Sequence, residues 1–138
     1  MRRFHLIAPL LLFLSIALVA GQTFAADFRG KELTIATWNI EWLDAELNRD
    51  RVKRDLGDLA ALNHFARQLH ADVVALQEVD GPEAARWVYP PNEYEYHFSV
   101  RRDVMRVGFA IRKGVQWQAN PDYSDLDVGD VRHGVDIT

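Results

Sequence analysis

Two polar side chains, Asn39 and Glu78, occur in apolar runs at points where packing alone would favour neither. Asn39 lies in the stretch TIATWNIEWL (34–43), and Glu78 lies in the stretch DVVALQEVDG (72–81). A carboxylate and an amide carbonyl that converge make an oxygen-only site suited to Mg²⁺, which keeps water and phosphate oxygens in its other positions. Such a metal polarises a phosphoryl group and stabilises a leaving oxygen. Spacing alone favours a simpler interpretation, in which Asn39 ends a strand in a turn and Glu78 is a solvated charge.

The segments around these two residues predict how they would meet. Residues 33–38 are short, apolar and rich in Thr and Ile, which is typical of a buried strand, and residues 72–79 predict a second one. Residues 58–70 between them predict an amphipathic helix. Its apolar face is expected to consist of Leu59, Leu62, Phe65, Ala66 and Leu69. Strand, helix and strand form a βαβ unit with parallel strands, so both polar side chains would reach the carboxyl edge of the sheet, where open α/β sheets bind ligands.

The second half of the chain predicts mainly strands. A short helix is expected over 83–88, with Pro82 in its first turn. Residues 94–99 and 106–112 alternate apolar and polar side chains, which predicts two half-buried strands that pair through a turn at 101–103. Two further segments are predicted to extend the sheet or to begin a new strand: 114–118 and 132–138.

The composition bounds the kind of protein. The chain has 138 residues, of which 49% are hydrophobic and 26% are charged, so it predicts a single globular domain with a modest core. It contains no Cys. A disulfide framework and a thiolate metal site are therefore excluded.

The first twenty-six residues are predicted to be a secretory signal peptide. Arg2 and Arg3 give a positive start, residues 6–20 form an uncharged apolar run, and small residues allow cleavage after Ala25 or Ala26. The alternative is an uncleaved membrane anchor, but the run is shorter than the roughly 20 apolar residues that span a bilayer. We therefore expect a domain over 27–138 that is exported to the periplasm or the extracellular space, with no membrane span after cleavage.

Cleavage would also change the charge. Without Arg2 and Arg3, 14 Lys and Arg remain against 20 Asp and Glu, a net charge of −6. Bulk electrostatics would then not hold a polyanion, so a phosphate substrate needs a bound cation or a local basic cluster. Arg101, Arg102 and Arg106 form such a cluster, although a turn with solvated arginines is the more common explanation of such a group.

These motifs also resemble a known family. The Thr-Trp-Asn motif that ends at Asn39, the Ala-Leu-Gln-Glu-Val motif around Glu78 and the strand RVGFAIR (106–112) are similar to those of the endonuclease/exonuclease/phosphatase superfamily, related to deoxyribonuclease I and exonuclease III. The resemblance covers residues 33–138. It implies an α/β fold, the N-terminal part of a four-layer α/β sandwich with mixed sheets. It also implies a Mg²⁺-dependent phosphodiesterase, in which Mn²⁺ can replace Mg²⁺ and nucleic acid is the expected substrate.

The resemblance assigns roles residue by residue. Glu78 is expected to be the metal ligand, and Asn39 to lie beside the metal and contact the phosphate, so both are candidate catalytic and metal-site residues. Gln77 is expected to support Glu78 through a hydrogen bond. Trp38 and Trp42 are expected to pack beneath the site.

Later motifs of the family are absent from the sequence. Its His-bearing strand, its Gly-Asp-Xaa-Asn motif and its closing Asp-His pair do not occur, and the chain stops within the predicted strand 132–138. The domain is therefore expected to be incomplete at its C-terminus. The alternative is a non-catalytic remnant or an interaction module. If the chain is active as it stands, His97 and His133 are the next candidates, and the substrate class stays open among DNA, RNA, nucleotides and phospholipid head groups.

Overall fold

A computed structural model describes residues 32–46, 52–100, 105–126 and 134–138. The predicted signal peptide, the turn at 101–103 and His133 lie outside these residues. Within them, no helix has both the length and the apolar character needed to cross a membrane. The described elements are β1 (Ile35–Leu43), α1 (Leu56–Gln68), β2 (Val73–Val79), α2 (Pro82–Ala85), β3 (Tyr94–Phe98), β4 (Arg106–Arg112) and the 3-10 turn η1 (Ser124–Leu126).

The strands form one mixed sheet in the order β1-β2-β4-β3. The β1 and β2 strands are parallel and α1 connects them, which confirms the predicted βαβ opening of an α/β fold. The β4 strand pairs antiparallel with both β2 and β3. It is therefore a central strand, and both Ala110 and Ile111 are fully buried, so the prediction of a half-buried strand was wrong for 106–112.

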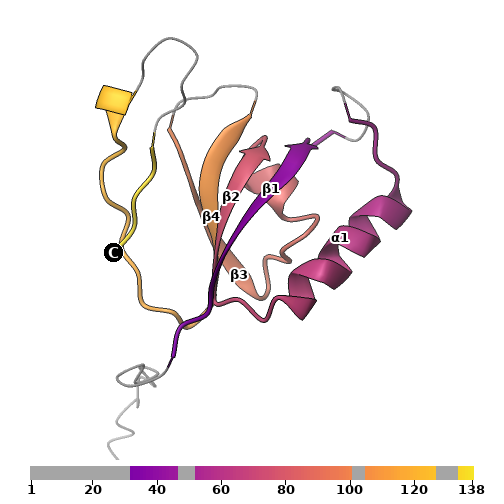
Figure 1. The fold of residues 1–138 in the computed structure, drawn as a ribbon, viewed down its shortest axis with the longest axis horizontal. Helices are drawn as coiled ribbons and strands as arrows, with labels where there is room; N and C mark the ends of the chain where they lie inside the picture. Colours follow the sequence, from indigo (N-terminus) through magenta and orange to yellow (C-terminus); the bar gives the residue numbers. More distant parts are fainter. Residues whose placement is uncertain (1–31, 47–51, 101–104, 127–133) are drawn as a thin grey trace, which may run out of the picture.

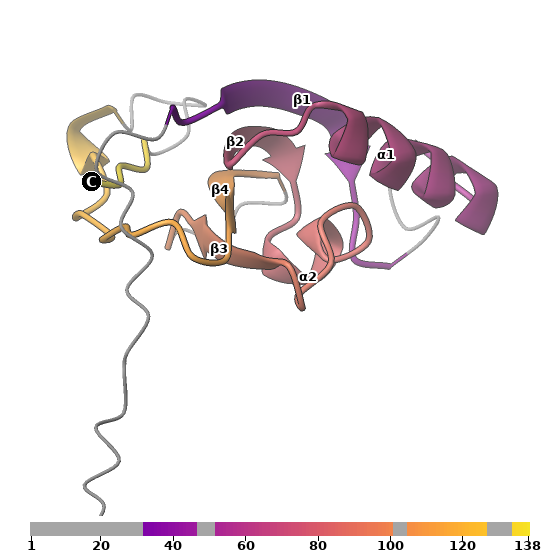
Figure 2. The same ribbon diagram turned by 90° about the horizontal axis from the view of Figure 1, so that it is seen from below.

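The helices cover one face of the sheet, and the described C-terminal segments lie on the other side (Figures 1 and 2). Alternate residues of the strands point toward the helices and form the hydrophobic core with them. The largest fully buried side chains include Leu76 and Val74 of β2 and Tyr89, which follows α2. The Asn63 side chain donates a hydrogen bond from Nδ2 to the Val88 carbonyl at 2.6 Å, which ties α1 to the segment after α2.

The α1 helix begins two residues earlier than the predicted range 58–70. Asp55 is its N-cap, and a reciprocal pair of hydrogen bonds joins the side chains of Asp55 and Asp58 to each other's backbone N–H groups. This capping box satisfies donors that the first helical turn leaves unpaired, which explains the earlier start. Leu59 and Ala66 are buried as predicted, but Phe65 is 56% and Leu69 43% exposed, so the apolar face is only partly covered.

Two predicted boundaries differ more strongly. The first strand was predicted to end before Asn39, but β1 continues to Leu43. The short helix α2 covers only Pro82–Ala85 and not 83–88. The N–H groups of Trp87 and Val88 donate to the carbonyls of Ala84 and Ala85, three residues back, so turns follow the helix up to Tyr89.

The segments 114–118 and 132–138 do not extend the sheet in the described residues. Gly114 has a φ of +98°, which turns the chain away from β4. The following segment pairs instead with the chain end through isolated bridges between Ala119 and Ile137 and between Tyr123 and Gly134. The prediction that 114–118 extends the sheet was therefore wrong. Of the predicted strand 132–138, the described residues 134–138 pair with residues 119 and 123 and add no strand to the sheet.

Candidate functional site

The carboxyl edge of β1 and β2 is irregular at the two residues that the sequence singles out. The strands are aligned up to the pair Asn39–Gln77 and again at Leu43–Val79. Between these pairs β1 has three residues, 40 to 42, and β2 has one, Glu78. Glu78 has a φ of 58°, in the left-handed region that side chains other than Gly seldom adopt. The strands rejoin through the hydrogen bond from the Asp80 N–H to the Leu43 carbonyl at 2.9 Å.

Asn39 and Glu78 meet at this irregularity. The Nδ2 atom of Asn39 donates a hydrogen bond to Oε1 of Glu78 at 3.0 Å, across 39 positions of sequence. The Oδ1 atom of Asn39 accepts a hydrogen bond from the backbone N–H of Glu41 at 2.9 Å. These two partners fix the amide, with its NH₂ group toward the carboxylate and its oxygen toward the backbone. Asn39 is exposed and Glu78 is half-buried, so the pair is accessible from solvent.

The oxygen atoms at this edge suit a divalent cation that takes most of its ligands from water and substrate phosphates. Glu78 offers a carboxylate with lone pairs that Asn39 does not use. The described part of the chain holds no group of three or more His, Cys, Asp and Glu side chains that could enclose a metal. Mg²⁺ is commonly bound by one or two carboxylates together with water and substrate phosphates, which matches a single carboxylate at an open edge.

Asn39 orients the carboxylate in this arrangement. Its carbonyl oxygen is occupied by the Glu41 N–H, so the amide acts on Glu78 as a hydrogen-bond donor. A donor on one carboxylate oxygen leaves the other to face a cation and sets the direction of its lone pairs. Direct ligation of a metal by Asn39 stays a prediction.

Gln77 does not support Glu78 as predicted. Its Nε2 atom donates to Oγ1 of Thr37 at 3.1 Å and to the carbonyl of Ala75 at 3.2 Å. Successive strand residues point to opposite faces, and the irregularity at Glu78 turns that side chain toward the edge. Gln77 therefore joins β2 to β1 on the face of the sheet. The sequence did not single out Thr37 as the partner of Gln77. Thr37 lies two residues before Asn39, so both are on the same face of β1.

The tryptophans and histidines fall in different places. Trp38 is half-buried and packs against the hydrophobic core. Trp42 is also half-buried. His97 lies on β3, which β4 separates from β2, and its ring centroid is 5.8 Å from that of Trp117. The structure therefore does not bring His97 to Asn39 and Glu78.

Arg106 is the described member of the predicted basic cluster. It pairs in register with Val79, next to Glu78 in the chain. Its guanidinium lies against Gly81, because a Cβ atom added there would be 3.0 Å from Cζ of Arg106. Its Nε is buried and has no hydrogen-bond partner among the residues that the structure describes. Arg101 and Arg102 lie outside the described residues.

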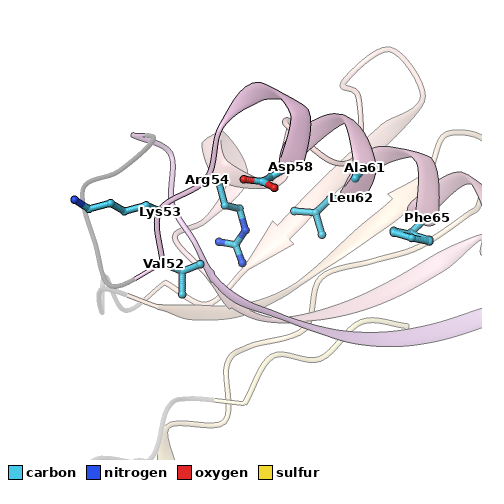
Figure 3. A pocket seen from close by; sticks show the side chains of 7 residues that line it. All are labelled: Val52, Lys53, Arg54, Asp58, Ala61, Leu62 and Phe65. Carbon is cyan, nitrogen blue, oxygen red and sulfur yellow. The ribbon is translucent and has the colours of Figure 1, made fainter.

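Among the clefts that the described residues form, two flank α1, and neither is lined by Asn39 or Glu78. The first has a volume of about 290 Å³ and runs along the start of the helix (Figure 3). The second has a volume of about 300 Å³ and is lined by Thr37, Trp38, Phe65, Gln68 and Leu69.

One comparison with known proteins gives a match. The model of the Endonuclease/Exonuclease/phosphatase family matches residues 36–138. The match begins in β1 and includes both Asn39 and Glu78. No curated protein and no solved structure matches the chain.

Proposed function

The chain belongs to the endonuclease/exonuclease/phosphatase family, and from this premise we propose that its Asn39–Glu78 edge is the metal-binding part of a phosphodiesterase site. Membership places the domain among hydrolases of phosphate esters. A mixed sheet that opens with a βαβ unit is consistent with the N-terminal part of that family's α/β sandwich. A nuclease is the activity we favour, with Mg²⁺ as the cofactor.

One observation carries the proposal: the 3.0 Å hydrogen bond between Asn39 and Glu78. Polar side chains also pair across ordinary strands, as Gln77 and Thr37 do, so the backbone around the pair gives this hydrogen bond its weight. Here the pair coincides with a left-handed Glu78 and with the loss of register between β1 and β2. Strained backbone of this kind is retained where the surrounding structure fixes it, and it is common at functional sites.

The residues of this chain have separable tasks in the proposed site. Glu78 supplies a ligand carboxylate, and Asn39 holds that carboxylate in one orientation through its amide donor. A divalent cation, when bound, would neutralise charge that develops on the phosphate oxygens during hydrolysis. Arg106 pairs in register with Val79, next to Glu78, and we infer that its charge attracts a substrate phosphate that the acidic surface would otherwise repel.

The test is hydrolysis by the purified protein with Mg²⁺ or with EDTA. Bis(p-nitrophenyl) phosphate, plasmid DNA and RNA serve as substrates. Glu78→Gln keeps the shape of the side chain but removes its charge. We expect Mg²⁺-dependent activity to fall at least about 10²-fold, since metal charge stabilisation is worth several kcal/mol.

The matched control is Glu95→Gln. Glu95 lies on β3 and accepts a hydrogen bond from Nε1 of Trp117 at 2.8 Å, which Gln can replace. This variant should keep the activity of the parent. Equal activity in parent and Glu78→Gln on all three substrates would refute the assignment.

A second candidate is metal or phosphate binding without turnover. The observation that favours it is the single carboxylate at the edge, with no three-residue acidic or histidine group in the described part of the chain. Groups that act together in catalysis fail together when some are lacking. Mg²⁺ binding that Glu78→Gln abolishes, with no hydrolysis above background in Mg²⁺ or Mn²⁺, would establish this candidate over the first.

A further inference from the structure

Arg54 contacts three consecutive backbone carbonyls at the end of β1. Its Nη2 atom donates to the carbonyls of Ile40 at 2.8 Å and Glu41 at 2.7 Å, and its Nη1 atom donates to that of Trp42 at 3.0 Å. Figure 3 shows the side chain leaving the segment before α1 and pointing toward β1. Within the described residues it makes no ion pair or hydrogen bond with a carboxylate. Its charge is therefore directed at the strand backbone.

These carbonyls converge because β1 changes conformation after Asn39. Glu41 has a φ of 45° and Trp42 a φ of 59°, so both are left-handed. Residues 40–42 have no aligned partner on β2, since register resumes only at Leu43. Backbone carbonyls at a partly buried position need a hydrogen-bond donor. Arg54 supplies that donor for all three and so stabilises the left-handed segment.

One peptide plane connects Arg54 to the site. The carbonyl of Ile40 and the N–H of Glu41 belong to the same rigid peptide group and point in opposite directions. Arg54 holds the carbonyl end, and the N–H end donates to Oδ1 of Asn39 at 2.9 Å. Asn39 in turn donates to Glu78. Rotation of this plane would remove the hydrogen bond that orients the Asn39 amide.

The position of Arg54 in the chain makes it a firm support. It precedes Asp55, the N-cap of α1, whose capping box fixes the start of the helix. A guanidinium has five N–H donors in a planar fork, so two of its nitrogens can serve three carbonyls at once. A lysine ammonium at the same place has three donors on a flexible stem and would match this geometry less well.

We propose that Arg54 is a positioning residue, which sets the Ile40–Glu41 peptide plane and thereby the orientation of Asn39 and Glu78. The effect on the backbone and on the Asn39 amide rests on the contacts above. The consequence for metal binding rests in addition on the proposed function.

The experiment is NMR spectroscopy of the ¹⁵N-labelled full protein without metal, for the parent, Arg54→Met and Arg54→Lys. We expect the Glu41 amide to exchange with solvent at least about tenfold faster in Arg54→Met, measured relative to the Leu76 amide, as the loss of a net hydrogen bond implies. The side-chain NH₂ resonances of Asn39 should shift toward those of a solvated amide. Arg54→Lys should be intermediate.

Arg67→Met is the matched control. Arg67 also lies in α1 and makes side-chain hydrogen bonds with Asn63 at 3.2 Å and Glu93 at 2.8 Å, and its polar partners among the described residues do not include β1. It should leave the Glu41 and Asn39 resonances unchanged. Unchanged resonances in a folded Arg54→Met protein, or equal changes in Arg67→Met, would overturn the proposal. If Arg54→Met does not fold, Arg54→Lys decides, and parent-like resonances there would overturn it.

A Mg²⁺ titration of the same samples separates this proposal from the proposed function. Apparent Mg²⁺ affinity should fall about 10-fold in Arg54→Met, the lower range for residues that orient a metal ligand. If the parent shows no Mg²⁺ binding that depends on Glu78, the proposed function fails. The metal-free resonances of Glu41 and Asn39 would still decide the role of Arg54.

Discussion

Leu76 and Glu78 lie two residues apart on the same strand and belong to two different regions of the molecule. Leu76 is fully buried and sits in the part of the sheet where β1, β2 and β4 keep their register. Glu78 is left-handed, half-buried and at the point where β2 loses its register with both neighbours. The regular region is held by apolar burial, and the carboxyl edge by a few directed hydrogen bonds.

The contrast separates stability from chemistry. In the regular region, continuous hydrogen bonding between strands satisfies the backbone N–H and C=O groups, and side chains pack in their usual strand positions. This region therefore needs no residues in unusual conformations. The edge keeps strained residues in place through Asn39 and Arg54, whose contacts contribute little to the core. Natural proteins depart from local regularity mainly where function requires it. Substitutions in the two regions should therefore affect different measurements.

The largest effect is expected from Leu76→Ala. Removing a fully buried Leu side chain leaves a cavity and should lower the free energy of unfolding by about 2–5 kcal/mol, measured by urea denaturation. Leu56→Ala is the control, because Leu56 is 67% exposed and should change stability by less than about 0.5 kcal/mol. In Leu76→Ala molecules that remain folded, the Asn39 side-chain resonances should match those of the parent. A large shift there would mean that the two regions are not separate.

A smaller effect on stability, but a larger effect on metal binding, is expected from Asn39→Ala. The exposed Asn39 makes two hydrogen bonds, so its loss should lower the free energy of unfolding by about 1 kcal/mol or less. Apparent Mg²⁺ affinity, measured by titration calorimetry, should fall about 10-fold because Glu78 loses the donor that orients it. Asn120→Ala provides the comparison, since that side chain bonds Asp136 and Thr138 in the C-terminal segment. Equal loss of affinity in both variants would contradict the special role of Asn39.

The last effect appears only at alkaline pH and concerns the buried region. Burial raises the pKa of Tyr96 from 10.0 to about 12, with a lowering effect of Arg86 and a raising effect of Glu83. Burial also raises the pKa of Tyr89. The folded state thus favours neutral Tyr96, and its hydroxyl donates to the Tyr89 carbonyl. This contribution to stability is complete below about pH 10 and is lost as pH rises through about 12.

Urea midpoints measured from pH 8 to pH 12 check this sign. They should decline above about pH 10 in the parent and less steeply in Tyr96→Phe, with Tyr89 responsible for the remainder. Tyr123→Phe, at a residue that is 55% exposed, should decline like the parent. Identical slopes in the parent and in Tyr96→Phe would show that Tyr96 does not titrate with unfolding.

Local pattern in the sequence determined much of the fold. Apolar alternation and helical spacing located β2, β3, β4 and α1 to within two residues at most ends, because these patterns depend on neighbours a few positions away. The two motifs singled out Asn39 and Glu78, and parallel pairing of β1 with β2 was enough to place them at one edge.

Tertiary structure decided the rest. The insertion of β4 between β2 and β3 depends on long-range pairing, which alternation within one strand does not specify. The left-handed conformations of Glu41, Trp42 and Glu78 run against the preferences of those residue types, and they persist because contacts from distant segments fix them. The same holds for Arg54, which lies in a charged stretch that resembles a solvated loop. Its three carbonyl partners become visible only once α1 has brought the start of the helix against the end of β1.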